Sequence, residues 1–402
     1  MTILSDSRAI VKRILPDLIA LRHELHRIPE IACEEHDTSA LLRRSLTGLH
    51  VKLLPPYIGT DVVGMLTGGR PGPNVMLRAD IDALPIEEKS GVSYVSGRRG
   101  MMHACGHDGH MAMLVGAARV LDRLAPRLAG SIRFVFQPGE EVRAAAKDLV
   151  EAGVLRNPRS GMAFALHGHP TTPVGSIGAI AGPACAAADF YGITVRGRGG
   201  HGSAPHRALN PIPVAARIIG ALEGLPSGRI DAQDPFVVTT CRMASGTTDN
   251  VIPPQAELAG TVRWYKDSVG AAAPVLIRRV VKGICHAAGA GYRIRYEQQY
   301  PSVVNDRTAV AIGRQAVTDA LGAGAWEEVK RPDMGAEDFA FYLRECPGAM
   351  FHLGMGPKSP MLHNDRFDFN DAAIASGVQF LVAAALGALE TLRAKKAPSA
   401  RR

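Results

Sequence analysis

Three short apolar segments in the first half of the chain each end in polar residues, and this pattern constrains the fold most. The segments are NVMLRADIDALP (74–85), SIRFVFQPGEE (131–141) and GMAFALHGHP (161–170). Residues 108–124 lie between the first two and have the apolar spacing of a helix. Repetition of strand, polar loop and helix is typical of an α/β layer with a mostly parallel sheet flanked by helices. In such sheets the catalytic and ligand-binding residues lie at the carboxyl ends of the strands.

The middle of the chain has a different pattern. Its apolar spacing predicts, in order, a strand (188–195), a helix (210–225), two adjacent strands (235–246 and 256–265), a helix (268–288) and a strand (291–300). The order β-α-β-β-α-β predicts a ferredoxin-like α+β domain. A helix (308–322), a strand (349–356) and a long helix (371–394) then return to the alternation of helices and strands found in the first half of the chain. We therefore predict a discontinuous catalytic domain, residues 1–186 and 299–402, with residues 187–298 inserted as a second domain.

Composition narrows the function classes. The net charge is +8, but aromatic residues make up only 5% and no basic stretch is interleaved with stacking residues. Nucleic-acid binding is therefore not predicted, because attraction of an anionic substrate explains the charge equally well. Part of the charge lies in residues 392–402, LRAKKAPSARR, which we interpret as a frayed basic tail.

The N-terminus, the apolar runs and the cysteines predict the cellular location of the protein. The N-terminus has an early acidic residue and no long apolar core, so we do not expect a signal peptide. Nor do we expect a membrane span, since we find no run of about eighteen apolar residues. Residues 380–392, FLVAAALGALETL, are interpreted as part of a buried helix. The six cysteines are scattered without a CxxC pair, which predicts free thiols in a reducing cytoplasm.

The densest chemical cluster is MHACGHDGH, residues 102–110. A thiol nucleophile at Cys105 would need a histidine partner, which is usually remote in sequence, and a redox centre would need a second nearby cysteine. Cys and His on a tight, glycine-containing loop favour a metal site, although a polar turn stays open on these nine residues alone. Cys105 and His107 share a face if the loop is extended. We interpret Asp108 as the cap of the following helix and His103 and His110 as supporting or core residues.

Further candidate ligands follow other predicted strands. Glu140 and Glu141 end the second apolar segment; adjacent carboxylates point in different directions, so one can bind metal while the other acts as a base. His167 directly follows the third segment, whereas we interpret His169 as exposed, and His363 precedes the last helix. Cys, three His and Glu exceed the needs of one tetrahedral zinc and suit two metals that share a bridging water.

The chain resembles the M20 metallopeptidase family, in particular its amidohydrolase branch of hippurate hydrolases, auxin-conjugate hydrolases and N-acyl-amino-acid deacylases. The resemblance covers almost the whole chain. It is carried by LRHELHRIPEIACEE, RADIDALPIEE, MHACGHDGHMAMLVGAA, FQPGEE, ALHGHP, GRGGHGSAPH, NVIPPQAEL, GTVR, MGAEDFAFYL and LHNDRFDF. The two-domain organisation predicted above agrees with the fold of that family.

The resemblance implies a role for each candidate residue. It implies a two-metal centre bound by Cys105, His107, Glu141, His167 and His363, with Glu140 as the general base that activates a metal-bridged water. It implies that the inserted domain is a lid and dimerisation domain of a homodimer, in which His201 steadies the oxyanion from the partner subunit. Asn250, Arg263 and Glu337 match substrate-contact positions; Arg263 would clamp a carboxylate. Asp80 and Asp82 stand where many M20 enzymes have a histidine ligand and a supporting aspartate, and we place both outside the ligand set.

The expected activity is hydrolysis of the amide bond of N-acyl amino acids. The alternatives are a dipeptidase, a hydrolase of another small amide, or a metal-binding regulatory protein without catalysis. Thiolate favours zinc, while His and carboxylate ligands also suit manganese, cobalt or nickel. The sequence departs from the branch pattern at ASGTTDNVIP, at Gly168 and His169, and at Asn210, and the second departure leaves the acyl preference open.

Overall fold

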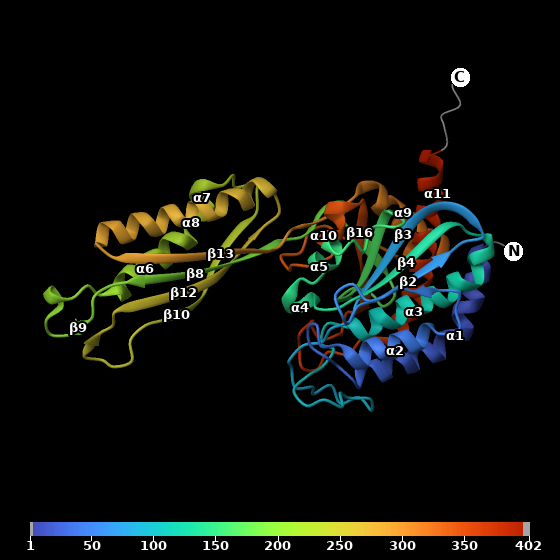
Figure 1. Ribbon diagram of the computed structural model, residues 1–402, viewed down its shortest axis with the longest axis horizontal. Coiled ribbons are helices and arrows are strands. Elements are labelled where there is room, and N and C mark those ends of the chain that lie inside the picture. The colour runs from blue at the N-terminus through green and yellow to red at the C-terminus, as the bar shows by residue number, and fades with distance from the viewer. Residues whose placement is uncertain (1–2, 397–402) are drawn as a thin grey trace, which may run out of the picture. The chain divides into compact units, whose positions relative to one another are not determined.

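The computed structural model describes residues 3–396, and the chain divides into two units (Figure 1). Unit 1 comprises Met1–Ala184, Val304–Arg331 and Asp338–Arg402, and unit 2 comprises Cys185–Val303 and Pro332–Glu337. The last six residues of the basic tail lie outside the described residues.

Unit 1 is built on a mixed eight-stranded sheet. Its order is β1 (Lys52–Leu53), β2 (Val62–Thr67), β4 (Ala129–Gln137), β3 (Arg70–Asp80), β5 (Ser160–Pro170), β16 (Gly348–Gly356), β6 (Ile177–Ala179) and β15 (Trp326–Glu328). The four central strands, β4, β3, β5 and β16, run parallel, whereas β1, β2 and the β16–β6 pair are antiparallel. The predicted α/β layer with a mostly parallel centre is confirmed. The short strands β1, β6 and β15 were not predicted, because two or three residues carry no readable periodicity.

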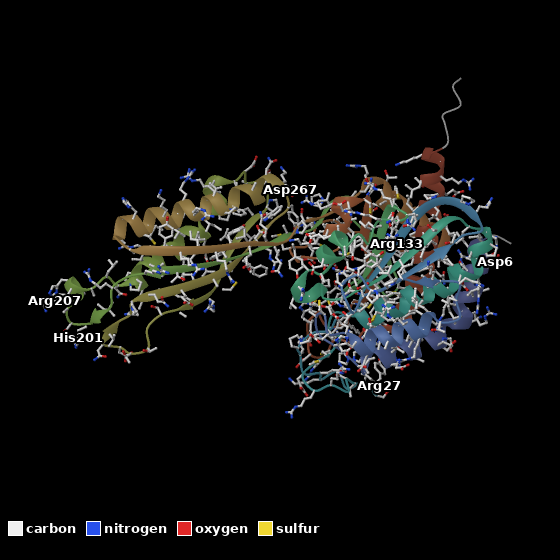
Figure 2. All side chains as sticks on the ribbon, viewed as in Figure 1. Asp6, Arg27, Arg133, His201, Arg207 and Asp267 are labelled. Atoms are coloured by element: carbon white, nitrogen blue, oxygen red, sulfur yellow. The ribbon has the colours of Figure 1, made fainter. Side chains whose placement is uncertain are left out.

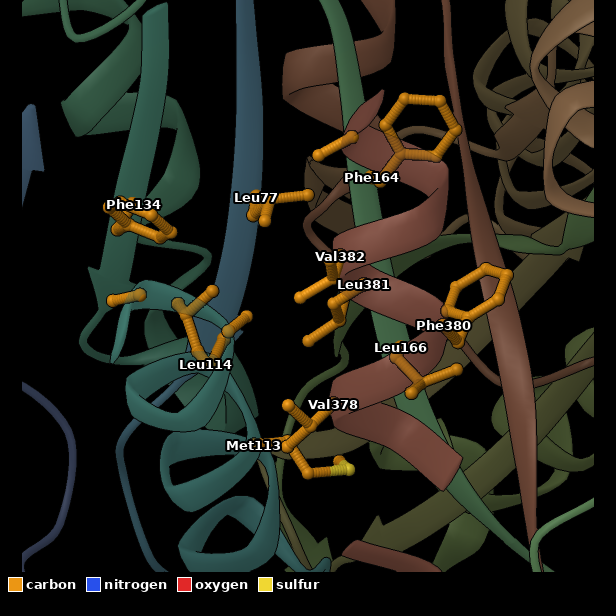
Figure 3. Packing of buried hydrophobic residues seen from close by; sticks show 14 of the residues in the cluster. Leu77, Met113, Leu114, Phe134, Phe164, Leu166, Val378, Phe380, Leu381 and Val382 are labelled. Carbon is orange, nitrogen blue, oxygen red and sulfur yellow. The ribbon is translucent and has the colours of Figure 1, made fainter. Parts of the chain in front are cut away.

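Helices cover the sheet of unit 1. The long ones are α1 (Ile3–His26), α2 (His36–Leu46), α3 (His107–Leu124), α9 (Arg307–Leu321) and α11 (Ile374–Lys396), and the short ones α4 (Glu140–Arg143), α5 (Ala146–Glu151) and α10 (Ala340–Glu345). Figure 3 shows Leu114 of α3 and Leu381 of α11 beside Leu77 of β3, within one buried core. Residues 15–49 have the apolar spacing of one helix, but the structure divides this stretch: α1 ends at His26 and α2 begins at His36. The break follows from Pro29, because a residue before proline, here Ile28, disfavours helical backbone.

The last helix is apolar enough to cross a membrane by length and composition. The stretch Asp371–Lys395 passes that test, but 67% of its most apolar window is buried inside the protein. It packs against α1, α3 and α9 and against β3. Burial of this kind is what a core helix of a folded domain requires, as we expected for residues 380–392.

Unit 2 has a four-stranded antiparallel sheet in the order β10 (Phe236–Ala244), β12 (Gln255–Trp264), β8 (Ala187–Arg196) and β13 (Gly291–Tyr300). Helices α6 (Pro211–Glu223) and α8 (Asp267–Ala288) contribute to its separate core. The chain order β8-α6-β10-β12-α8-β13 is the predicted β-α-β-β-α-β arrangement. Smaller elements are α7 (Leu225–Arg229) and the strand pairs β9 (Gly200–His201) with β11 (Val251–Ile252) and β7 (Gly182–Cys185) with β14 (Val303–Asn305).

The start of α3 packs tightly against the segment that follows β16. A Cβ added at Gly109 would lie 2.4 Å from the ring of Phe369, which is only 1% exposed. We expect Gly109→Ala to lower the free energy of unfolding by about 2 kcal/mol, because overpacking a buried ring outweighs the better helix propensity of alanine. Urea denaturation measures this change. The control is Gly283→Ala in α8, where no atom lies within 4 Å, and which should be neutral or stabilising; equal stability of the two variants would contradict the packing argument.

Candidate metal centre

The predicted ligands lie at the carboxyl edge of the parallel strands. Cys105 and His107 lie on the loop and helix start that follow β3, and Glu141 lies on α4 after β4. His167 is near the end of β5, and His363 is in the loop after β16. Parallel strands bring their carboxyl ends to one edge of the sheet, which explains why residues as distant in the sequence as Cys105 and His363, 258 positions apart, belong to one cluster.

The five side chains approach one another closely. Cys105 Sγ is 3.5 Å from His167 Nε2, and His107 Nε2 is 3.9 Å from Glu141 Oε1. His363 Nε2 is 3.4 Å from Glu141 Oε2. One ligand atom each of Cys105, His107 and Glu141 lies within 4.8 Å of the others, a separation that a shared cation can bridge.

Two atoms at the centre of this cluster have no hydrogen-bond partner among the described residues. They are His107 Nε2 and Glu141 Oε1, and both are buried. Buried polar atoms are normally hydrogen-bonded, so an unpaired nitrogen facing an unpaired carboxylate oxygen indicates a missing third group. The donor set of imidazole, carboxylate and thiolate fits a divalent transition-metal cation.

The two histidine rings are already oriented for such a cation. His107 Nδ1 lies 2.8 Å from the carbonyl oxygen of Asp82, and His167 Nδ1 lies 2.8 Å from that of Gly168. A carbonyl only accepts, so each Nδ1 carries the hydrogen and donates it. In the neutral ring each Nε2 then keeps its lone pair, which is the arrangement that metal-binding histidines have in proteins.

A second group of buried polar side chains contacts the candidate ligands or their neighbours: Asp80, Asp82 and His110. His110 Nδ1 is 2.6 Å from Asp80 Oδ1, and the backbone NH of Gly168 donates to His110 Nε2 at 2.8 Å. Asp80 Oδ2 accepts from Arg78 at 2.7 Å and lies 3.7 Å from His107 Nε2. Asp82 Oδ2 accepts from the backbone NH of Glu141 at 3.0 Å. Both nitrogens of His110 have partners, and each oxygen of Asp80 already accepts one contact, so these groups are placed to orient the candidate ligands.

The charges around the cluster favour a cation. Burial alone would lower the pKa of His107, but Asp80, Asp82 and Glu141 raise it to about 10. Burial raises the pKa of the Cys105 thiol well above its usual value, and Glu141 and Glu140 raise it further. A thiol with a raised pKa is a poor nucleophile without a cation beside it, which argues against the nucleophile alternative. Burial lowers the pKa of His167 well below its usual value, so its ring is neutral.

A sharp turn presents Glu140. It is the first residue of α4 and only 7% exposed, and the preceding Gly139 has a φ of +62°, which glycine adopts without strain. Glu35 accepts from the backbone NH groups of Gly139 (3.0 Å) and Cys33 (2.8 Å) and from the Thr60 hydroxyl (2.7 Å). A fully buried carboxylate thus holds the turn that carries both Glu140 and Glu141.

Two interpretations from the sequence are wrong. Asp108 is not the cap of α3: Gly106 is, with a φ of +87°. Asp108 is instead buried in the first turn, where it accepts from Arg22 Nε at 2.7 Å and pairs with His26 Nδ1 at 2.8 Å. His169 is half-buried rather than exposed and stacks on His352 with ring centroids 4.4 Å apart. The missed partners of Asp108 lie four residues apart in LRHELH, a spacing that places both on one face of a helix.

His26 makes the stability of the protein depend on pH. Burial alone would lower its pKa, but Asp108 and hydrogen bonds to Asp108 and Glu88 raise the pKa of His26 to about 9. The folded state therefore holds a proton that the unfolded chain releases near pH 6.5. This stabilisation is complete below about pH 6.5 and is lost as the pH rises through about 9, and it amounts to up to roughly 3 kcal/mol. The stability difference between wild type and His26→Gln, both metal-free, should shrink from pH 6 to pH 9.5 in urea denaturation; a pH-independent difference would contradict this account.

The remaining candidate residues belong to unit 2. His201, on β9, is exposed, and its Nδ1 accepts from the Ser203 hydroxyl at 2.7 Å; Figure 2 shows it in the same part of unit 2 as Arg207. Asn250 is exposed just before β11, and Arg263 is half-buried on β12. Glu337 ends the short segment Pro332–Glu337 and is buried. The five ligand candidates and Glu140, in contrast, all lie in unit 1.

Comparison with known proteins agrees with this site. The model of peptidase family M20/M25/M40 matches residues 76–387. The chain is 36% identical to an N-acetylcysteine deacetylase of Bacillus subtilis, over 94% of this chain and 98% of that protein. It is 37% identical to an N-acyl-L-amino acid amidohydrolase of Geobacillus stearothermophilus, over 75% of this chain and 81% of that protein.

A solved structure is similar over nearly the whole chain. It is the YXEP protein of Bacillus subtilis, a dinuclear metal-binding peptidase of the M20 family, with a TM-score of 0.83 and 34% identity. The match covers 94% of this chain and 99% of that one. The chain therefore belongs to peptidase family M20/M25/M40 and is a hydrolase of its amidohydrolase type.

Proposed function

We propose that this protein hydrolyses the amide bond of N-acyl amino acids at a centre of two divalent cations. Cys105, His107, Glu141, His167 and His363 would hold the cations. The observation that carries the proposal is the pair of unpaired buried atoms, His107 Nε2 and Glu141 Oε1, that face each other across 3.9 Å. The names of the relatives support the substrate class, since two of them are a deacetylase and an amidohydrolase of N-acyl amino acids.

When bound, divalent cations polarise an amide carbonyl and acidify a nearby water. Glu140, next to Glu141 and buried, takes the proton from that water and passes it to the departing amine. His107 and His167 keep their rings fixed through backbone carbonyls, so neither has to reorient during the reaction. The thiolate favours zinc, and manganese, cobalt or nickel also suit the mixed ligand set.

Unit 2 supplies the substrate contacts in this proposal. It acts as the lid and dimerisation domain of a homodimer, and His201 from the partner subunit donates to the developing oxyanion. Arg263 binds the free carboxylate of the amino acid, and Asn250 and Glu337 line the substrate position. The protein acts in the cytoplasm, where its cysteines, which form no disulfide in the described part of the chain, remain reduced.

A substrate panel tests the proposed activity. We expect hydrolysis of N-acetyl and N-benzoyl amino acids, with kcat/KM at least about tenfold lower for the matching amides that lack the carboxylate, because one charge-assisted ion pair contributes about that factor. Faster hydrolysis of dipeptides would establish a dipeptidase instead. Absence of hydrolysis across the panel, with metal bound, would favour the non-catalytic alternative.

A further inference from the structure

The two loops that carry His363 and the Cys105–His107 pair rest directly on each other. We call residues 357–370 the His363 loop and residues 103–107 the Cys105 turn. The backbone NH of His363 donates to the carbonyl oxygen of Ala104 at 2.9 Å. Phe367 and Phe369 of the His363 loop are buried against Gly106 and Gly109. Residues of widely separated sequence position thus form one packed layer beside the ligands.

Between these two phenylalanines, Asp368 turns toward helix α1. It pairs with the guanidinium of Arg22, whose side chain is 0% exposed. Arg22 also donates to Asp371 Oδ1 at 3.1 Å, just beyond the His363 loop, and to the Tyr94 hydroxyl at 3.0 Å. Its Nε donates to Asp108, the residue that follows His107. One guanidinium therefore binds acceptors at the ends of both ligand-bearing segments.

Arg22 is well suited to fix the spacing of these segments. Its planar fork directs its N–H donors in set directions, whereas a lysine ammonium offers a rotating point charge. The neighbouring residues Leu18, Leu21 and Leu25 are buried in the core and fix α1, so the backbone that carries Arg22 is held in place. The carboxylates of Asp108, Asp368 and Asp371 surround the guanidinium of Arg22. Without its positive charge, these three carboxylates would repel one another and separate the two segments.

His363 depends on such support more than the other ligands do. Its side chain is 52% exposed, whereas that of His107 is 0% exposed. Its backbone has a φ of +63°, a conformation that residues with side chains rarely adopt. Neighbouring structure must therefore hold it in place.

We infer that Arg22 is a positioning residue that sets the distance between the His363 loop and the Cys105 turn, and so the affinity for the cation that His363 helps to bind. The inference rests on the proposed metal centre. It assigns no chemical step to Arg22, which acts only through Asp368, Asp371 and Asp108. Weakening the ion pair between Arg22 and Asp368 should reduce the affinity for the cation that His363 helps to bind. It should leave metal binding by Cys105 unchanged.

Cobalt titration of the full-length protein tests this inference. Co²⁺ bound to a thiolate has a charge-transfer band, which reports coordination by Cys105, while calorimetry reports the number and affinity of bound ions. For Asp368→Asn, we expect the thiolate band to persist and the affinity for the second Co²⁺ to fall by about 10–100-fold, the usual effect of losing a supporting partner. Arg22→Gln removes the positive charge and should lower the affinity for the second Co²⁺ in the same way. Arg22→Lys keeps the charge and should bind the second Co²⁺ more tightly than Arg22→Gln does.

The control is Arg13→Gln, which removes an exposed arginine from the same helix and should bind both Co²⁺ ions as wild type does. Melting of the metal-free proteins separates positioning from folding, because Asp368 is 27% exposed and its neutral variant should unfold within a few degrees of wild type. If Asp368→Asn and Arg22→Gln bind both ions as tightly as wild type, the inference is wrong and the metal centre stands. If wild type binds no Co²⁺, the proposed function is wrong and this inference with it.

Discussion

Replacing Glu140 by Gln is expected to reduce kcat for an N-acyl amino acid by about 10²–10⁴-fold, the usual contribution of a general base. Gln has nearly the shape of Glu but cannot accept a proton at neutral pH. Glu140 is buried at the start of α4, beside Glu141, where a small change of side-chain volume would itself disturb that candidate ligand. The isosteric change therefore removes the proton transfer and keeps the geometry.

Two measurements on the same preparation check this expectation. Steady-state kinetics should give the loss of kcat, and elemental analysis should give unchanged metal content. Glu151→Gln is the matched control, since Glu151 lies on the neighbouring helix α5 with its side chain 66% exposed and should keep full activity. Wild-type kcat in Glu140→Gln would remove Glu140 from the mechanism.

Replacing His107 by Ala is expected to abolish high-affinity metal binding. His107 offers a ligand atom within 4.8 Å of Cys105 and Glu141 and also within 4.8 Å of His167, so it lies between the candidate ligands of both cations. Loss of a partner of a ligand typically costs 10–100-fold in affinity, so loss of a shared ligand should cost at least about 100-fold, and activity should fall with it.

Competition against a chelating dye measures that affinity. The control is His50→Ala, whose side chain is 87% exposed and lies outside the cluster. Circular dichroism should show that both variants are folded. An affinity of His107→Ala equal to that of wild type would exclude His107 as a ligand.

The sequence predicts the fold and the gathering of the ligands for one physical reason. Apolar strands that end in Glu140–Glu141 and in His167 reveal both the sheet and its functional edge, since parallel strands end at the same side. The distance between Cys105 and His167 then follows from topology rather than from sequence separation. Edge strands of two or three residues, such as β1 and β15, leave no such pattern.

Other features depended on three-dimensional packing. Asp108 has the sequence position of a helix cap, yet Arg22 and His26 from a distant helix bind it, and Gly106 takes the cap position. The stacking of His169 on His352 depends on β5 and β16 being neighbours. The roles of His201, Asn250, Arg263 and Glu337 remain predictions from the family resemblance, and variants of each in the substrate panel would test them.

Metal analysis is the most direct test of the central claim, that this protein is a two-cation amide hydrolase. The protein is purified without added metal salts, its divalent metal is counted, and amide hydrolysis is followed before chelation, after chelation and after refilling. The account predicts about two bound ions, loss of activity on chelation and recovery on refilling with zinc, manganese, cobalt or nickel. Full activity in a sample free of metal would contradict it.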